Sequence, residues 1–313
     1  MASEAFPWVP PGKLSSRGTH YILQERADCK GLVVFVHGIG TYHYYHEGLA
    51  GHVYKAGFST LILDNLGMGH SLYPSEAEDR PSLWDGSGHV AQIQDLLTEL
   101  SLAQKPHYIV GHSMGGALAT LYAAKYPEVR GIILLSPSGV QSPFEPKILP
   151  VTVLRNALPS CLISTIFDGI KKDSVNIDKI RKFGDFIDEK SPASEASAQQ
   201  ILRQHINNKS AVRALFNCAR FFPLTSCHEA VNKVGASSVK VLVLHGDEDK
   251  TVRPTPSTTV WAKALTGRND GVSRVELVRG AHAFSLEYPE AIGKTLVEWL
   301  LKAGGAGDDL NRK

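Results

Sequence analysis

The sequence predicts an α/β protein with a doubly wound, mostly parallel sheet and a helical cap insertion. Three observations support this class. Short, almost uninterrupted apolar runs recur along the chain, which is typical of strands buried on both faces. Helix-like stretches lie between these runs, and such alternation indicates a parallel sheet covered on both sides. The alternation stops over residues 140–235.

The expected elements follow one another in a simple order. Six apolar runs predict strands at residues 31–37, 60–64, 107–110, 132–135, 239–244 and 273–278. The stretches between and after them predict helices at residues 46–55, 89–100, 117–126, 257–265 and 289–301.

The insertion contains no convincing strand run, and its apolar residues recur at helical spacing. We therefore expect a helical cap at residues 140–235, and a core formed by residues 1–139 and 236–313. Apolar side chains in such a cap more often pack against the core than contact a substrate. Phe216, Phe221 and Phe222 nevertheless suggest a hydrophobic acyl or alcohol group.

Composition narrows the class of partner. With 313 residues, 43% hydrophobic and 20% charged, the chain resembles a soluble globular protein. A net charge of +2 gives no reason to expect nucleic acid as the main partner. There is no apolar run of about 18 residues, so no spanning helix is expected. The first residues lack a secretory pattern, and the four cysteines lack zinc-binding spacing, so we expect free thiols and a cytoplasmic location.

The most informative motif is Gly111-His112-Ser113-Met114-Gly115, directly after an expected strand and before an expected helix. A serine between two glycines at such a turn is the pattern of a nucleophile elbow. The turn is crowded, so only residues without Cβ fit at the flanking positions. As a bare pattern the motif also fits an ordinary glycine-rich turn. Its position between strand and helix favours Ser113 as a nucleophile.

A hydrolytic serine needs a base and an acid that orients the base. His282 follows the last expected strand in a glycine-containing turn, and we predict it as the base. The preceding strand is followed by three carboxylates, of which Asp249, three residues past Gly246, is the preferred acid. Asp247 remains the alternative. His245, at the strand end, is expected to be structural.

Acyl chemistry also needs donors for the oxyanion. The backbone N–H of Met114 is the first candidate, because it follows the nucleophile at a helix start. The second candidate is the N–H of Ile39 in the glycine-rich turn after the first expected strand. An ordinary strand-to-helix turn would also use the glycines on either side of Ile39. The following segment, residues 42–46, is expected at the pocket rim or in the first turn of a helix.

Taken together, these motifs resemble the α/β-hydrolase superfamily, in its capped serine esterase, lipase and peptidase-like branch. The resemblance covers the core and rests on five stations in order: residues 37–40, 64–71, 111–116, 246–249 and His282. It implies a serine hydrolase that cleaves a carboxylic ester through an acyl-enzyme, with neither metal nor organic cofactor. Relatives that use aspartate at the elbow are excluded by Ser113.

The substrate stays open at this point. A small-molecule ester or a lipid is expected, and an acyl-thioesterase, an acylglycerol lipase or a lysophospholipid lipase is an alternative. A peptide substrate is less favoured, because the cap shows no charged cluster suited to a peptide terminus. Peripheral contact of the cap with a membrane is compatible with the sequence. Fold does not dictate function, so a ligand-binding module on the same fold is the non-enzymatic alternative.

Overall fold

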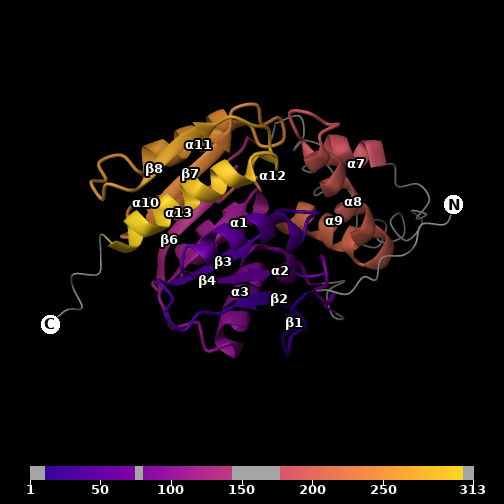
Figure 1. Cartoon of the computed structure of the whole chain (residues 1–313), viewed down its shortest axis with the longest axis horizontal. Helices are drawn as coiled ribbons and strands as arrows, with labels where there is room; N and C mark the ends of the chain where they lie inside the picture. The colour runs from indigo at the N-terminus through magenta and orange to yellow at the C-terminus, as the bar shows by residue number, and fades with distance from the viewer. Residues whose placement is uncertain (1–10, 75–79, 143–176, 306–313) are drawn as a thin grey trace.

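The computed structural model describes residues 11–74, 80–142 and 177–305 (Figure 1). Its centre is an eight-stranded sheet with the strand order β1-β2-β4-β3-β5-β6-β7-β8. The strands β3 to β8 pair in parallel, whereas β1 and β2 form an antiparallel edge. A doubly wound, mostly parallel sheet is therefore confirmed. The strands are β1 (Lys13–Leu14), β2 (His20–Gln24), β3 (Leu32–Val36), β4 (Ser59–Leu63), β5 (His107–His112), β6 (Val129–Leu135), β7 (Lys240–Gly246) and β8 (Arg274–Val278).

Helices cover both faces of this sheet (Figure 1). The alternation of side chains along β3 explains why both faces need cover: Val34 and Val36 enter one buried cluster, while Val33 and Phe35 enter the other. One face carries α1 (Tyr44–Lys55) and α13 (Pro289–Gly305), which contact each other. The other carries α3 (Gly86–Glu99), α4 (Met114–Ala123), α10 (His228–Gly235) and α11 (Pro254–Ala264).

Four short elements were not predicted from the sequence. The strands β1 and β2 were not expected, because β1 has two residues and β2 lacks the long apolar run of a central strand. The helices α2 (Pro81–Trp84) and α12 (Phe284–Glu287) have four residues each, too few for a helical period to show. The six expected strands and five expected helices are all present, with ends shifted by a few residues.

Between β6 and β7, the described residues form helices and no strand. These helices are α7 (Ile177–Gly184), α8 (Pro192–Asn207), α9 (Ala211–Phe221) and α10. Figure 1 shows α7, α8 and α9 grouped at one end of the molecule, whereas α10 packs against α4 and α11. Residues 143–176 lie outside the described residues, so the division into a core of 1–139 and 236–313 and a cap of 140–235 stays a proposal.

Each helix within the described ranges is too short or too polar to cross a lipid bilayer. Three of the four cysteines are described, and all three are free thiols, as expected. The fourth, Cys161, lies outside the described residues.

Candidate active site

Ser113 lies at the sharp turn between β5 and α4, as the motif predicts. Its backbone has φ 54° and ψ −117°, a conformation that side chains rarely adopt and that costs about 1–3 kcal/mol. Both flanking positions need glycine, because a Cβ there would clash with a backbone carbonyl oxygen. A Cβ on Gly111 would lie 2.2 Å from the Gly115 carbonyl oxygen, and a Cβ on Gly115 would lie 2.1 Å from the Val36 carbonyl oxygen. The turn therefore holds the serine at the carboxyl end of the sheet.

His282 and Asp249 come together after β8 and β7. His282 Nδ1 lies 2.8 Å from Asp249 Oδ2, while Asp249 Oδ1 accepts the backbone N–H groups of Thr251 and Val252 at 2.9 and 2.7 Å. Both side chains are buried. The carboxylate is therefore fixed on one side by backbone and directed on the other side at the imidazole.

Burial by itself would raise the pKa of Asp249. The charge of His282 and hydrogen bonds from His245 and His282 outweigh it, so the pKa of Asp249 is held well below its usual value. His245 is fully buried, with Nε2 2.7 Å from the Val252 carbonyl oxygen and 3.4 Å from Asp249 Oδ2. The structural role expected for His245 is thus a contact with the carboxylate of Asp249.

The competing carboxylates occupy different positions on the same loop. Asp247 and Glu248 are exposed. Asp247 Oδ1 accepts the backbone N–H of Gly280 at 3.0 Å, which ties the β7 loop to the β8 loop. The structure therefore brings Asp249, and neither of its neighbours, to His282.

Ser113 and His282 line the same small cavity, with a volume of about 50 Å³. Its wall is mostly apolar or neutral, and none of its described lining residues is a carboxylate or a basic residue other than histidine. Gly184 of α7 and Ser197 and Ile201 of α8 form one side of it. The lining residues are Gly38, Ile39, Thr41, Tyr45, His112, Ser113, Gly184, Ser197, Ile201, Thr251, His282 and Ala283.

The three cap phenylalanines that suggested a hydrophobic substrate group are not among these lining residues. Phe222 is fully buried in the main core, where its ring lies 5.7 Å from that of His89. The Phe221 ring lies 5.0 Å from the Arg220 guanidinium. Phe222 packs into the core, and a different helix, α8, supplies the apolar Ile201 to the cavity. A hydrophobic acyl or alcohol group stays a prediction.

The two expected oxyanion donors lie next to the serine. Met114 is the first residue of α4, and the first N–H groups of a helix have no partner within it. Ile39 follows β3 and lines the cavity. The carbonyl of Gly38, the residue before Ile39, accepts the Thr41 hydroxyl at 3.0 Å, which fixes the turn that carries Ile39.

Two neighbours of the site, His112 and Tyr45, contact each other, and only Tyr45 belongs to a segment that was expected near the pocket. The ring of His112 stacks on Tyr45 at 4.1 Å, and its Nε2 lies 3.0 Å from both the Tyr45 hydroxyl and the His282 carbonyl oxygen. Burial and the nearby His282 lower the pKa of His112 well below its usual value, so the ring is neutral. His112 therefore supports the backbone of His282, the predicted base. Tyr45 meets both expectations for residues 42–46, since it lines the cavity and lies in the first turn of α1.

Comparison with known proteins agrees with this geometry. The family model described as serine aminopeptidase, S33, matches residues 27–271. A region of 200 residues is 28% identical to Lipase 3 of a Moraxella strain and covers 63% of this chain and 56% of that protein. A region of 234 residues is 27% identical to mouse monoacylglycerol lipase ABHD6 and covers 72% of this chain and 64% of that protein. The matches thus span less than two-thirds of these relatives.

Solved structures share the whole architecture at low identity. The enol-lactonase from Burkholderia xenovorans LB400 superposes with a TM-score of 0.67 at 19% identity, over 90% of this chain and 96% of that one. An esterase from Exiguobacterium antarcticum superposes with a TM-score of 0.66 at 18% identity, over 90% and 95% of the two chains. At this identity the likeness concerns the fold. The chain has the α/β-hydrolase fold and belongs to the serine aminopeptidase S33 family.

Proposed function

We propose that the protein is a serine hydrolase that cleaves a carboxylic ester through an acyl-enzyme intermediate. The observation that carries this proposal is that His282, which lies 2.8 Å from Asp249, lines the same cavity as Ser113, the residue at a strained strand-to-helix turn. In this proposal Ser113 is the nucleophile, His282 the base and Asp249 the residue that orients the base. The N–H groups of Ile39 and Met114 stabilise the oxyanion.

The reaction follows from these positions. His282 Nε2 takes the Ser113 proton as Oγ attacks the acyl carbonyl, and negative charge develops on the carbonyl oxygen. Asp249 stabilises the imidazolium that forms, because its carboxylate is ionised and already bonded to Nδ1. The imidazolium then protonates the departing alcohol. A water molecule, deprotonated by His282, attacks the acyl-enzyme and releases the acid.

The cavity wall supports a neutral, partly apolar substrate. Ile39 and Ile201 give apolar surface, and the hydroxyl groups of the lining residues Thr41, Ser197 and Thr251 are hydrogen-bonded to other protein groups. Lipase 3 and monoacylglycerol lipase, the printed names of two relatives, agree with a lipid-like or small acyl ester. An acyl-thioesterase, an acylglycerol lipase or a lysophospholipid lipase is the alternative, because these substrates differ mainly in the leaving group.

The family description also raises aminopeptidase activity. A free peptide N-terminus is a cation and favours a carboxylate partner, and no lining residue in the described part of the chain supplies one. We therefore place peptides behind esters. The same proposal includes a cytoplasmic location, contact of the cap with a membrane surface and an acyl-enzyme intermediate. The composition and motifs of the sequence support these three points.

Hydrolysis of p-nitrophenyl esters from acetate to palmitate tests the function, with Ser113→Ala as control. We expect activity that falls by several orders of magnitude in the variant. The volume of about 50 Å³ favours short acyl chains. An aminoacyl p-nitroanilide in the same assay tests the peptidase alternative. A folded protein without activity on any of these substrates would favour a ligand-binding module.

A further inference from the structure

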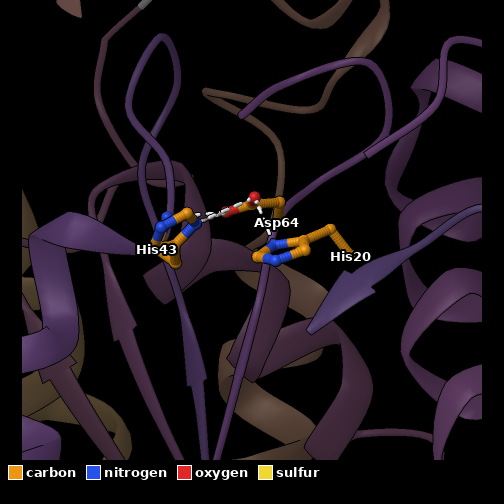
Figure 2. Close-up of side chains that lie close together, drawn as sticks. All are labelled: His20, His43 and Asp64. Carbon is orange, nitrogen blue, oxygen red and sulfur yellow. Dashed lines mark hydrogen bonds and ion pairs between the residues drawn. The ribbon is translucent and has the colours of Figure 1, made fainter. Parts of the chain in front are cut away.

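A second group of buried polar side chains lies apart from the proposed active site, where β2 and β4 meet the start of α1. It consists of His20 at the start of β2, His43 at the N-cap of α1 and Asp64 directly after β4. His20 and Asp64 are fully buried, and His43 is 4% exposed. Figure 2 shows Asp64 between the two imidazole rings, and one ligand atom from each residue lies within 4.8 Å of the others.

Backbone groups fix the carboxylate in this cluster. Asp64 Oδ1 accepts the His43 N–H at 2.6 Å, and Oδ2 accepts the His70 N–H at 2.9 Å. His20 Nδ1 and His43 Nδ1 lie 2.8 and 3.0 Å from the same Oδ2 (Figure 2). Two imidazole nitrogens therefore converge on one anchored carboxylate oxygen.

The other ring nitrogens face oxygen atoms too. His20 Nε2 lies 3.1 Å from the Pro11 carbonyl oxygen, and His43 Nε2 lies 3.6 Å from the Glu47 carboxylate. A neutral imidazole has one N–H and one lone pair, so it cannot donate to two acceptors. When the N–H of His20 lies on Nε2 and donates to the Pro11 carbonyl, its Nδ1 lone pair faces Asp64 Oδ2, and a cation beside Oδ2 would satisfy both atoms. In metal-bound histidines the second ring nitrogen donates to a carbonyl or carboxylate, and the Pro11 carbonyl has that position for His20.

We propose that His20, His43 and Asp64 form a binding site for a divalent transition metal such as Zn²⁺. The ligand atoms are the two Nδ1 atoms and Oδ2, a donor set that suits this class of ion.

A metal at this position would be structural. It would connect the start of β2, the N-terminus of α1 and the loop after β4, and α1 begins five residues after Ile39. The proposal does not depend on the proposed hydrolase function. Sequence spacing could not reveal it, because Asp64 lies 44 positions from His20 and 21 from His43. The expectation of no zinc site considered only cysteine pairs and finger-type histidine spacing.

Metal titration of the full, tag-free chain tests the proposal. The protein is stripped with EDTA, and Co²⁺ uptake is followed by its visible d–d absorption, with Zn²⁺ added as competitor. We expect one site per chain and a rise in melting temperature on adding Zn²⁺. His20→Asn and His43→Asn keep an amide donor near Nδ1 but lose the metal ligand. Each should weaken binding by more than about 100-fold, since the loss of an outer-shell partner alone weakens it 10- to 100-fold.

His107→Asn is the matched control, because His107 is buried and its Nδ1 lies 2.8 Å from the Lys105 carbonyl oxygen, outside the cluster. It should bind metal like the original chain. Absence of stoichiometric uptake by the folded original chain would overturn the proposal. Binding by the two cluster variants that is as tight as that of the original chain would overturn it too. If those variants do not fold, X-ray absorption of the zinc-loaded original chain decides. Imidazole ligands without sulfur support the site, and cysteine ligands overturn it.

Discussion

At the scale of single residues, the loop after β7 separates carboxylates by environment. Asp249 is buried and bonded to His282, whereas Asp247 is exposed and holds the backbone of Gly280. Local sequence could rank these carboxylates by their distance from the turn glycine. It could not show that His245 reaches back to the acid, because that contact depends on how the loop returns to its own strand.

Asp249→Asn should lower kcat for ester hydrolysis by about 10³- to 10⁴-fold, because the amide no longer stabilises the imidazolium or selects the correct tautomer of His282. Asp247→Asn is the matched control, since its remaining carbonyl oxygen still accepts the Gly280 N–H. Steady-state kinetics of the two variants, with circular dichroism as the folding check, distinguishes them. Equal losses in both would contradict the assignment of the acid.

At the scale of elements, the central strands and long helices could be predicted because their signal is local. The short antiparallel edge could not, because β2 pairs with β4 through register and not through a distinctive sequence. The position of α8 relative to the loops after β3 and β4 could not be predicted from the sequence either. It rests on polar contacts of α8, among them Gln204, which donates to the Gly40 carbonyl at 2.9 Å and accepts the Gly69 N–H at 2.5 Å.

Gln204→Ala should lower kcat/KM for esters by about ten-fold, which corresponds to the loss of one or two buried hydrogen bonds. Gly40 directly follows Ile39, so the lost contact loosens the turn that is proposed to supply an oxyanion donor. Asn207→Ala, an exposed position on the same helix, is the control and should keep full activity. A larger effect on KM than on kcat would mean that Gln204 shapes the pocket and does not position the turn.

Two glycine replacements, one at the elbow and one inside α1, should have opposite effects on the free energy of unfolding. Gly115→Ala places a Cβ 2.1 Å from the Val36 carbonyl oxygen and should lower the free energy of unfolding by about 3 kcal/mol or more. Gly51→Ala lies inside α1 with no heavy atom within 4 Å of the new Cβ, and should raise this free energy by about 0.5–1 kcal/mol. Urea denaturation measures both. Destabilisation by Gly51→Ala would contradict the helix assignment there.

At the scale of the whole molecule, stability should depend on pH through buried histidines. His89 is a fully buried residue of α3, and burial lowers its pKa from 6.5 to about 4. The unfolded chain takes up a proton below pH 6.5, but the folded chain does not until about pH 4. The stability from neutral His89 is therefore complete above pH 6.5 and is lost as the pH falls toward 4.

Between these pH values the free energy of unfolding should fall by about 1.4 kcal/mol per pH unit from His89 alone. His89→Gln removes this contribution, so its stability curve should be flatter than that of the original chain. The difference at pH 8, where His89 is neutral in both states, measures the cost of the replacement itself. Parallel curves between pH 6.5 and 5 would show that His89 takes up its proton in the folded state.

The central claim is that Ser113 is a nucleophile activated by His282 and Asp249. The most direct measurement is fluorophosphonate labelling, read by intact mass and by mapping the modified peptide. We predict one adduct per chain on Ser113, none in Ser113→Ala, and much slower labelling in Asp249→Asn. A folded original chain that stays unlabelled, or a Ser113→Ala variant that is labelled to the same extent, would contradict the account.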